Sequence, residues 1–100
     1  KLEKIILNLP KTLLARYIRL TDVMQEFGPN IGFPHTKHLA NGLYELRLKG
    51  AEGIARVFFC TIIQRKITML HCFIKKQKKI PKKELEIVKY RLKEIYNESL

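Results

Sequence analysis

Acidic residues are scarce in this sequence. It contains 9 Asp and Glu residues against 20 Lys and Arg residues, which leaves a formal net charge of +11. Such a balance favours a negatively charged partner: nucleic acid, an anionic membrane surface or an acidic protein. No apolar run approaches the roughly 18 residues that a membrane-spanning helix needs, and no signal-peptide pattern leads the chain. We therefore expect a cytoplasmic protein that is not bound to a membrane.

Cysteine is also rare. Cys60 and Cys72 both lie within apolar, strand-like segments, so we expect small buried thiols rather than a disulfide. His35 and His38 form an H-x-x-H pair, but with the two cysteines they match no paired metal-ligand spacing. A Gly-rich phosphate loop, a Ser/His/Asp order and paired catalytic acids are all missing. We expect neither a metal ion nor a cofactor.

The length of 100 residues and the apolar fraction of 46% suit one small domain, residues 1–100, with one core. Apolar residues at helical spacing predict a short helix over 2–9, ended by Pro10, and a second helix that runs to about Phe27. The following stretch, GPNIGFPHTKHLANG (28–42), consists of turn-forming residues and predicts a surface loop.

From residue 43 the apolar spacing changes to every second residue, which predicts strands over 43–49, 54–63 and 67–74. Because the links between them are short, with GAEG (50–53) as the expected hairpin connection, we expect an antiparallel meander. The second segment, IARVFFCTII, is apolar on both faces and should be central. Pro81 opens a last helix. The order predicts an α+β fold: a small twisted antiparallel sheet with two N-terminal helices and a C-terminal helix. We expect the helices on one face and the other face open.

One polar face of this sheet carries Glu45, Arg47 and Lys49, and the next strand adds Arg56. An arginine is costly to bury alone, so Arg56 must meet an anion or reach water. It can form a cross-strand pair with Glu45 that stabilises the sheet. It can also join Arg47 in a cleft that holds a phosphate, because guanidinium forks match phosphate oxygens. The two interpretations can coexist, with Glu45 orienting an arginine.

His71, near the end of the third predicted strand, is either a core residue with its hydrogen bonds satisfied or a proton shuttle. A run of lysines follows that strand, and two more lie in the first turn of the last helix: Lys75, Lys76, Lys78, Lys79, Lys82 and Lys83. A run of charged residues is usually only a solvated surface. Lysines in the first turn of a helix, however, are unfavourable because they lie next to the positive end of the helix dipole. Composition and pattern alone indicate a small basic α+β domain that binds nucleic acid.

The sequence also contains several motifs in a fixed order: FGPNIGFPHTKHLANG, GLYELR, ARVFF, LHCFIKK and K-x-P-x-x-E. Over residues 13–94 the sequence resembles the RelE/HigB toxin superfamily, in particular its phage-derived HigB-like branch. The resemblance implies the toxin of a type II toxin–antitoxin pair, an endoribonuclease that cuts mRNA in the ribosome without a metal. Family members usually begin with a strand, and none precedes Leu2 here, so we expect that strand to be missing from this chain or absent.

By motif position, Arg56 resembles the family's phosphate-holding arginine, and Arg47 and Glu45 match positions that are often catalytic or substrate-binding. Glu45 is the candidate base, and His71 is a further catalytic candidate. The candidate RNA-binding residues are all lysines: Lys49, Lys75, Lys76, Lys78, Lys79, Lys82 and Lys83. The resemblance also implies a helix-turn-helix antitoxin, HigA-like, in a toxin–antitoxin hetero-oligomer, with the ribosome and mRNA as further partners.

Two other functions fit the same charge. One is a non-catalytic, phage-derived protein that binds nucleic acid without cutting it, with salt-dependent binding and no toxicity. The other is an interaction protein whose positive surface meets only an acidic protein partner.

Overall fold

The computed structural model describes residues 2–32, 35–40, 42–61, 66–75 and 80–99. In this part of the chain it contains three helices and four strands. They follow one another in this order: α1 (Leu2–Leu7), α2 (Lys11–Phe27), β1 (Thr36–Ala40), β2 (Leu43–Gly50), β3 (Gly53–Cys60), β4 (Thr68–Lys75) and α3 (Lys82–Ser99). The predicted α+β fold, with two N-terminal helices and one C-terminal helix around a small antiparallel sheet, is confirmed.

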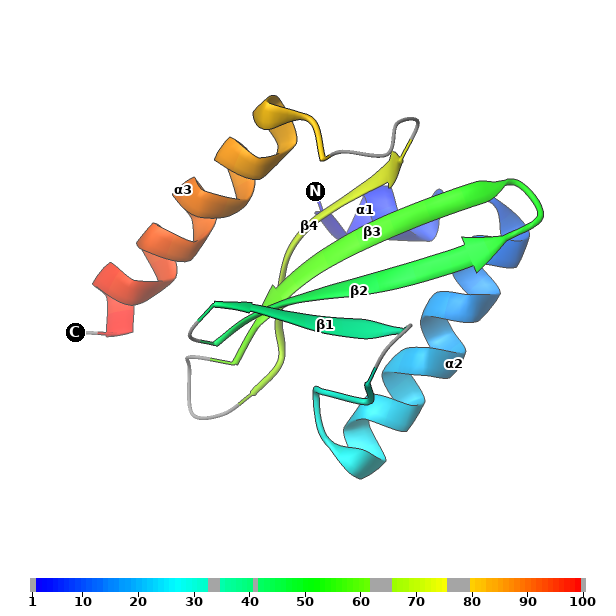
Figure 1. Ribbon diagram of the computed structural model, residues 1–100, viewed down its shortest axis with the longest axis horizontal. Helices are drawn as coiled ribbons and strands as arrows, with labels where there is room; N and C mark the ends of the chain where they lie inside the picture. The colour runs from blue at the N-terminus through cyan, green and yellow to red at the C-terminus, as the bar shows by residue number, and fades with distance from the viewer. Residues whose placement is uncertain (1, 33–34, 41, 62–65, 76–79, 100) are drawn as a thin grey trace.

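The sheet is an antiparallel meander with the strand order β1-β2-β3-β4 (Figure 1). The three predicted strands are present, and β3 is interior, as its apolar sequence indicated. The prediction of a surface loop over 28–42 was wrong in part, because β1 lies within it and pairs with β2. A strand of five residues between turn-forming residues has too short an alternation to be recognised. It is stabilised by its partner strand.

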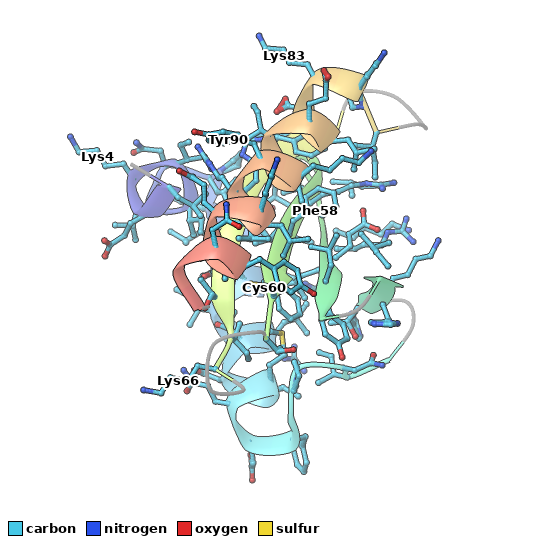
Figure 2. All side chains as sticks on the ribbon, turned by 90° about the vertical axis from the view of Figure 1, so that its left-hand side faces the viewer. Lys4, Phe58, Cys60, Lys66, Lys83 and Tyr90 are labelled. Carbon is cyan, nitrogen blue, oxygen red and sulfur yellow. The ribbon has the colours of Figure 1, made fainter. Side chains whose placement is uncertain are left out.

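Helices cover both faces of the sheet, so the expectation that all helices share one face was wrong. Figure 1 shows α1 and α2 on one side and α3 on the other. In Figure 2, α3 lies in front of the sheet, over Phe58 and Cys60. These two residues pack in a core cluster with Val88, while Val57 and Phe59, which alternate with them along β3, belong to the α2 side. Because β3 is apolar on both faces, each face needs its own helical cover.

The hairpin between β2 and β3 is held against α2. Gly50 and Gly53 are cross-strand partners, which confirms the GAEG connection. A Cβ added at Gly50 would lie 2.6 Å from the Thr12 hydroxyl oxygen and 2.9 Å from a methyl of Leu13. The Thr12 hydroxyl also donates a hydrogen bond to the carboxylate of Glu52 at the hairpin tip. The close approach that glycine permits therefore fixes the N-terminal half of α2 beside the end of β2.

The two cysteines are buried, as predicted, and point to opposite faces of the sheet. Cys72 lies on the α2 face and Cys60 on the α3 face. Burial raises the pKa of the Cys72 thiol to about 11, and the same cause raises the pKa of nearby Tyr17. Both groups therefore stay neutral at physiological pH. Among the described helices, none is long and apolar enough to cross a membrane.

Candidate nucleic-acid interface

Arginines from two neighbouring strands lie side by side on the α3 face of the sheet. Arg47 of β2 and Arg56 of β3 are direct cross-strand partners, so their side chains leave the sheet on the same face. This face is only partly covered, because α3 packs mainly against β4, at the other edge from β1. Next to the arginines lies a cavity of about 240 Å³, which we call the arginine cavity; Thr36, Lys37, Glu45, Arg47 and Arg56 line it.

Two of the residues that line the arginine cavity form a buried ion pair. Arg56 Nη1 donates to Glu45 Oε2 at 2.5 Å, and the two residues are only 8% and 3% exposed. The predicted Glu45–Arg56 pair is therefore present, on a diagonal of the β2–β3 ladder. Arg56 Nε is also buried and has no hydrogen-bond partner in the described part of the chain. A guanidinium with one nitrogen bound and another unsatisfied retains capacity for a second oxygen ligand.

A second cavity lies at the edge of the sheet, where β2 extends past the start of β1. This edge cavity has a volume of about 330 Å³, and its lining residues are Arg16, His35, Arg47, Lys49 and Ile54. Arg47 thus lines both cavities. The predicted RNA-binding residue Lys49 is exposed here, next to Arg47 on the same face of β2.

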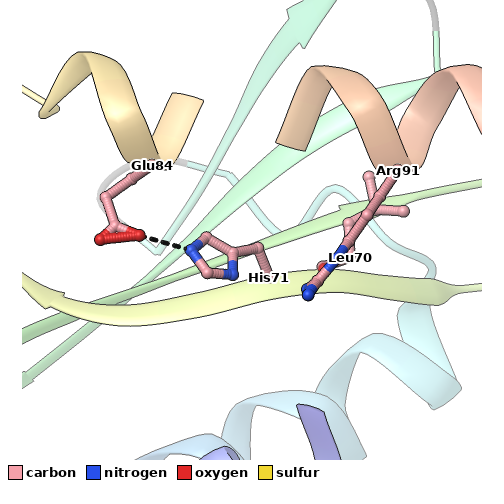
Figure 3. A network of polar contacts seen from close by, with 4 residues as sticks. All are labelled: Leu70, His71, Glu84 and Arg91. Carbon is pink, nitrogen blue, oxygen red and sulfur yellow. Dashed lines mark hydrogen bonds and ion pairs between the residues drawn. The ribbon is translucent and has the colours of Figure 1, made fainter. Parts of the chain in front are cut away.

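The structure does not bring His71 to either cavity. Figure 3 shows its imidazole beneath α3, where Nε2 lies 2.7 Å from Glu84 Oε1. Close by, Arg91 of α3 donates to the carbonyl oxygen of Leu70 at 2.6 Å. His71 is 7% exposed, and its Nδ1 is buried with no partner among the described residues. These contacts tie α3 to β4, which fits the interpretation of His71 as a core residue.

The predicted lysines divide into four groups. Lys49 lines the edge cavity, as described. Lys82 and Lys83 are exposed in the first turn of α3 (Figure 2 labels Lys83). Lys75 is the last residue of β4 and pairs with Ile54. Lys76, Lys78 and Lys79 lie outside the described residues.

Four polar residues that line the two cavities were not predicted as site residues from the sequence. Arg16 lies on α2, and its exposed position in an amphipathic helix carries no signal of a site. Thr36 and Lys37 begin β1 and His35 precedes it, all within the stretch predicted as a loop. Thr36 is also buried, and its hydroxyl accepts from Gly32 N and donates to Asn30 Oδ1.

Within the described ranges, no group of His, Cys, Asp and Glu side chains could hold a metal ion. The two cavities together present several cationic side chains and one carboxylate, a set that suits a substrate with several phosphates.

Comparison with protein families identifies the family of this chain. Residues 4–93 match the model of the family described as phage derived protein Gp49-like (DUF891), and the chain belongs to this family. The family is one of RelE/HigB-like toxins. Among curated proteins, none matches the chain.

Proposed function

We propose that this protein is the toxin of a type II toxin–antitoxin system and cuts mRNA on the ribosome as a metal-independent endoribonuclease. The observation that carries the proposal is the pair of cross-strand arginines, Arg47 and Arg56, on the partly open face of the sheet. Membership of a family of RelE/HigB-like toxins supports it. The net charge of +11 supplies the attraction to RNA that such an enzyme needs.

In the proposed reaction, the ribose 2′-oxygen attacks the adjacent phosphorus and loses its proton to a base. The bond between phosphorus and the 5′-oxygen breaks, which leaves a cyclic phosphate, and the departing 5′-oxygen takes up a proton to become a hydroxyl. Arg47 and Arg56 bind the phosphate and stabilise the negative charge that develops on its oxygens. Glu45, held by Arg56 beside the cavity, is the candidate base and also orients the guanidinium. The ribosome positions the mRNA and supplies proximity.

The proposal includes cytoplasmic action and an inhibitory partner, a helix-turn-helix antitoxin of the HigA-like kind, in a hetero-oligomer. Exposed lysines such as Lys82 and Lys83 would extend the RNA-binding surface along α3. An antitoxin that neutralises the protein must compete with RNA for this basic face or keep the toxin from the ribosome.

The test is induced expression with growth measurement and mapping of mRNA 5′ ends. The Arg47→Glu variant is suited to it because Arg47 is only half-buried and no described acid pairs with it. Lys66→Glu is the matched control: it makes the same charge change at an exposed residue, which lines a separate pocket with Tyr17 and Met24. We expect Lys66→Glu to inhibit growth and cut mRNA like the wild type, and Arg47→Glu to do neither. Full cutting by a folded Arg47→Glu protein would contradict the proposed site.

One observation favours a second function, binding of nucleic acid without cleavage. Both candidate proton-transfer groups are occupied: Glu45 by Arg56, and His71 by Glu84. A binding protein with this site would retain RNA with a steep salt dependence but produce no new 5′ ends and no growth arrest. The same expression experiment therefore separates the two functions.

A further inference from the structure

The edge cavity is built by residues from different parts of the chain. Arg16 comes from the middle of α2, His35 from the residue before β1, and Arg47 and Lys49 from β2. No residue in its described lining carries a negative charge. Three cations that line one cavity repel one another, and such a cluster is stabilised by a bound anion.

The backbone segments that carry these residues are held by contacts that do not involve the lining side chains. The backbone N–H of Arg47 donates to the carbonyl oxygen of His35 at 2.8 Å, and His35 N–H donates to Gly32 O at 3.0 Å. Arg16 lies one helical turn after Thr12, whose hydroxyl is bonded to Glu52 on the hairpin. The close packing of Gly50 against α2 completes this attachment. These contacts hold α2, the residue before β1 and the end of β2 next to one another without using the side chains that line the cavity.

The edge cavity and the arginine cavity are adjacent, because Arg47 lines both. Along β2, Arg47 and Lys49 are two residues apart on one face, a separation of about 7 Å. An extended RNA strand that places one phosphate at Arg47 and Arg56 would carry its next phosphate toward Lys49, Arg16 and His35.

We propose that the edge cavity is a second phosphate subsite, in which Arg16 and His35 bind the RNA phosphate next to the one that is cut. The inference rests on the proposed function, since it takes RNA as the ligand. It assigns Arg16 and His35 to substrate positioning, with no part in proton transfer. The subsite would require a strand that runs across the β1–β2 edge of the sheet, and it favours single-stranded over double-stranded RNA because only an extended strand follows this edge.

The test measures binding of a fluorescent single-stranded 2′-O-methyl RNA hexamer by anisotropy over a range of salt concentrations. This RNA cannot be cleaved, because its 2′-oxygens are blocked. The variants are Arg16→Gln and His35→Gln, with Lys66→Gln as the control for loss of an exposed cation elsewhere. Both hydrogen bonds of the His35 segment involve backbone atoms, so His35→Gln should keep them; thermal melting checks the fold of every variant.

We expect Arg16→Gln to reduce the slope of log affinity against log salt by about 0.7, the loss of one phosphate contact on a single strand. His35→Gln should weaken binding several-fold, and Lys66→Gln should bind like the wild type. With mRNA bound to ribosomes as the substrate, Arg16→Gln and His35→Gln should raise KM far more than they lower kcat, as expected for residues that bind the ground state and transition state equally.

Two results would overturn the inference and are distinguishable. If the wild type binds and cuts RNA but Arg16→Gln and His35→Gln match it in affinity, salt slope and KM, the subsite is refuted while the proposed function stands. If the wild type neither binds the hexamer nor cuts mRNA, the proposed function fails, and the subsite fails with it.

Discussion

The buried ion pair between Arg56 and Glu45 allows a quantitative prediction. Arg56→Met removes the guanidinium and leaves a carboxylate that is 3% exposed without its partner. Removing one member of a buried pair costs about 3–5 kcal/mol, because the remaining charge stays desolvated. A domain of this size unfolds with a free energy of roughly 5–15 kcal/mol, so the single substitution removes a large share of its stability. The cost should fall toward the lower value because Lys37, the cross-strand partner of Glu45, is near.

The measurement is urea unfolding, followed by circular dichroism, of the wild type, Arg56→Met, Glu45→Leu and the double variant. We expect each single variant to lose about 3 kcal/mol or more, and the double variant to lie within about 1–2 kcal/mol of the wild type. The reason is that apolar side chains of similar volume leave no uncompensated charge. The double variant therefore supplies a folded protein without either group, in which loss of RNA cleavage can be assigned to the site rather than to unfolding.

A loss of less than about 1 kcal/mol in Arg56→Met would refute the reasoning, since that is the range of solvent-exposed pairs. It would mean that water reaches Glu45 when Arg56 is removed. A double variant as unstable as the sum of the single variants would also contradict it, because it would show no coupling between the two side chains.

Three further predictions concern the parts that surround the site. Gly50→Ala should destabilise the protein by about 1–3 kcal/mol through overpacking against Thr12 and Leu13, whereas Ala51→Ser at the exposed hairpin tip should change stability by less than about 0.5 kcal/mol in the same urea assay. Burial raises the pKa of Cys72 to about 11, so the folded state holds the thiol proton more tightly than the unfolded state. The free energy of unfolding should therefore be constant below about pH 8.5 and decline as the pH rises toward 11. Cys72→Val should reduce that decline. His71→Gln should lower stability by about 1 kcal/mol and increase hydrogen exchange in α3, since it loses the hydrogen bond between the imidazole and Glu84. Loss of cleavage at unchanged stability and exchange would instead make His71 catalytic.

Much of the fold followed from local patterns in the sequence. The apolar stripe of α2 and the two-residue alternation of β2 identified their elements, and the GAEG hairpin connection was also predicted. The apolar character of β3 on both faces correctly indicated an interior strand. The same apolar character also implied a helix on each face, but the prediction from the sequence placed all helices on one face. β1 was missed because a short edge strand depends on its neighbour rather than on its own propensity.

The candidate site was predictable only in its central residues. Alternation along β2 placed Glu45 and Arg47 on one face, and Arg56 stood out as the charge in an apolar strand. Their cavity partners Arg16, His35 and Lys37 come from segments far away in sequence or from the missed strand. The position of His71 in the sequence of β4 did not show that it lies away from the two cavities. Its contact with Glu84 on α3 shows this.

The sequence by itself determined the class of fold, the excess of positive charge and the strands that carry the two arginines, because these depend on the periodicity and composition of neighbouring residues. Only the tertiary structure decided that Arg47 and Arg56 are direct partners, that Arg47 lines two cavities, and that His71 contacts α3 instead of lining either cavity. Strand register and the choice of face by a helix arise from packing between distant segments. A local pattern specifies which side chains need cover but does not specify which element provides it.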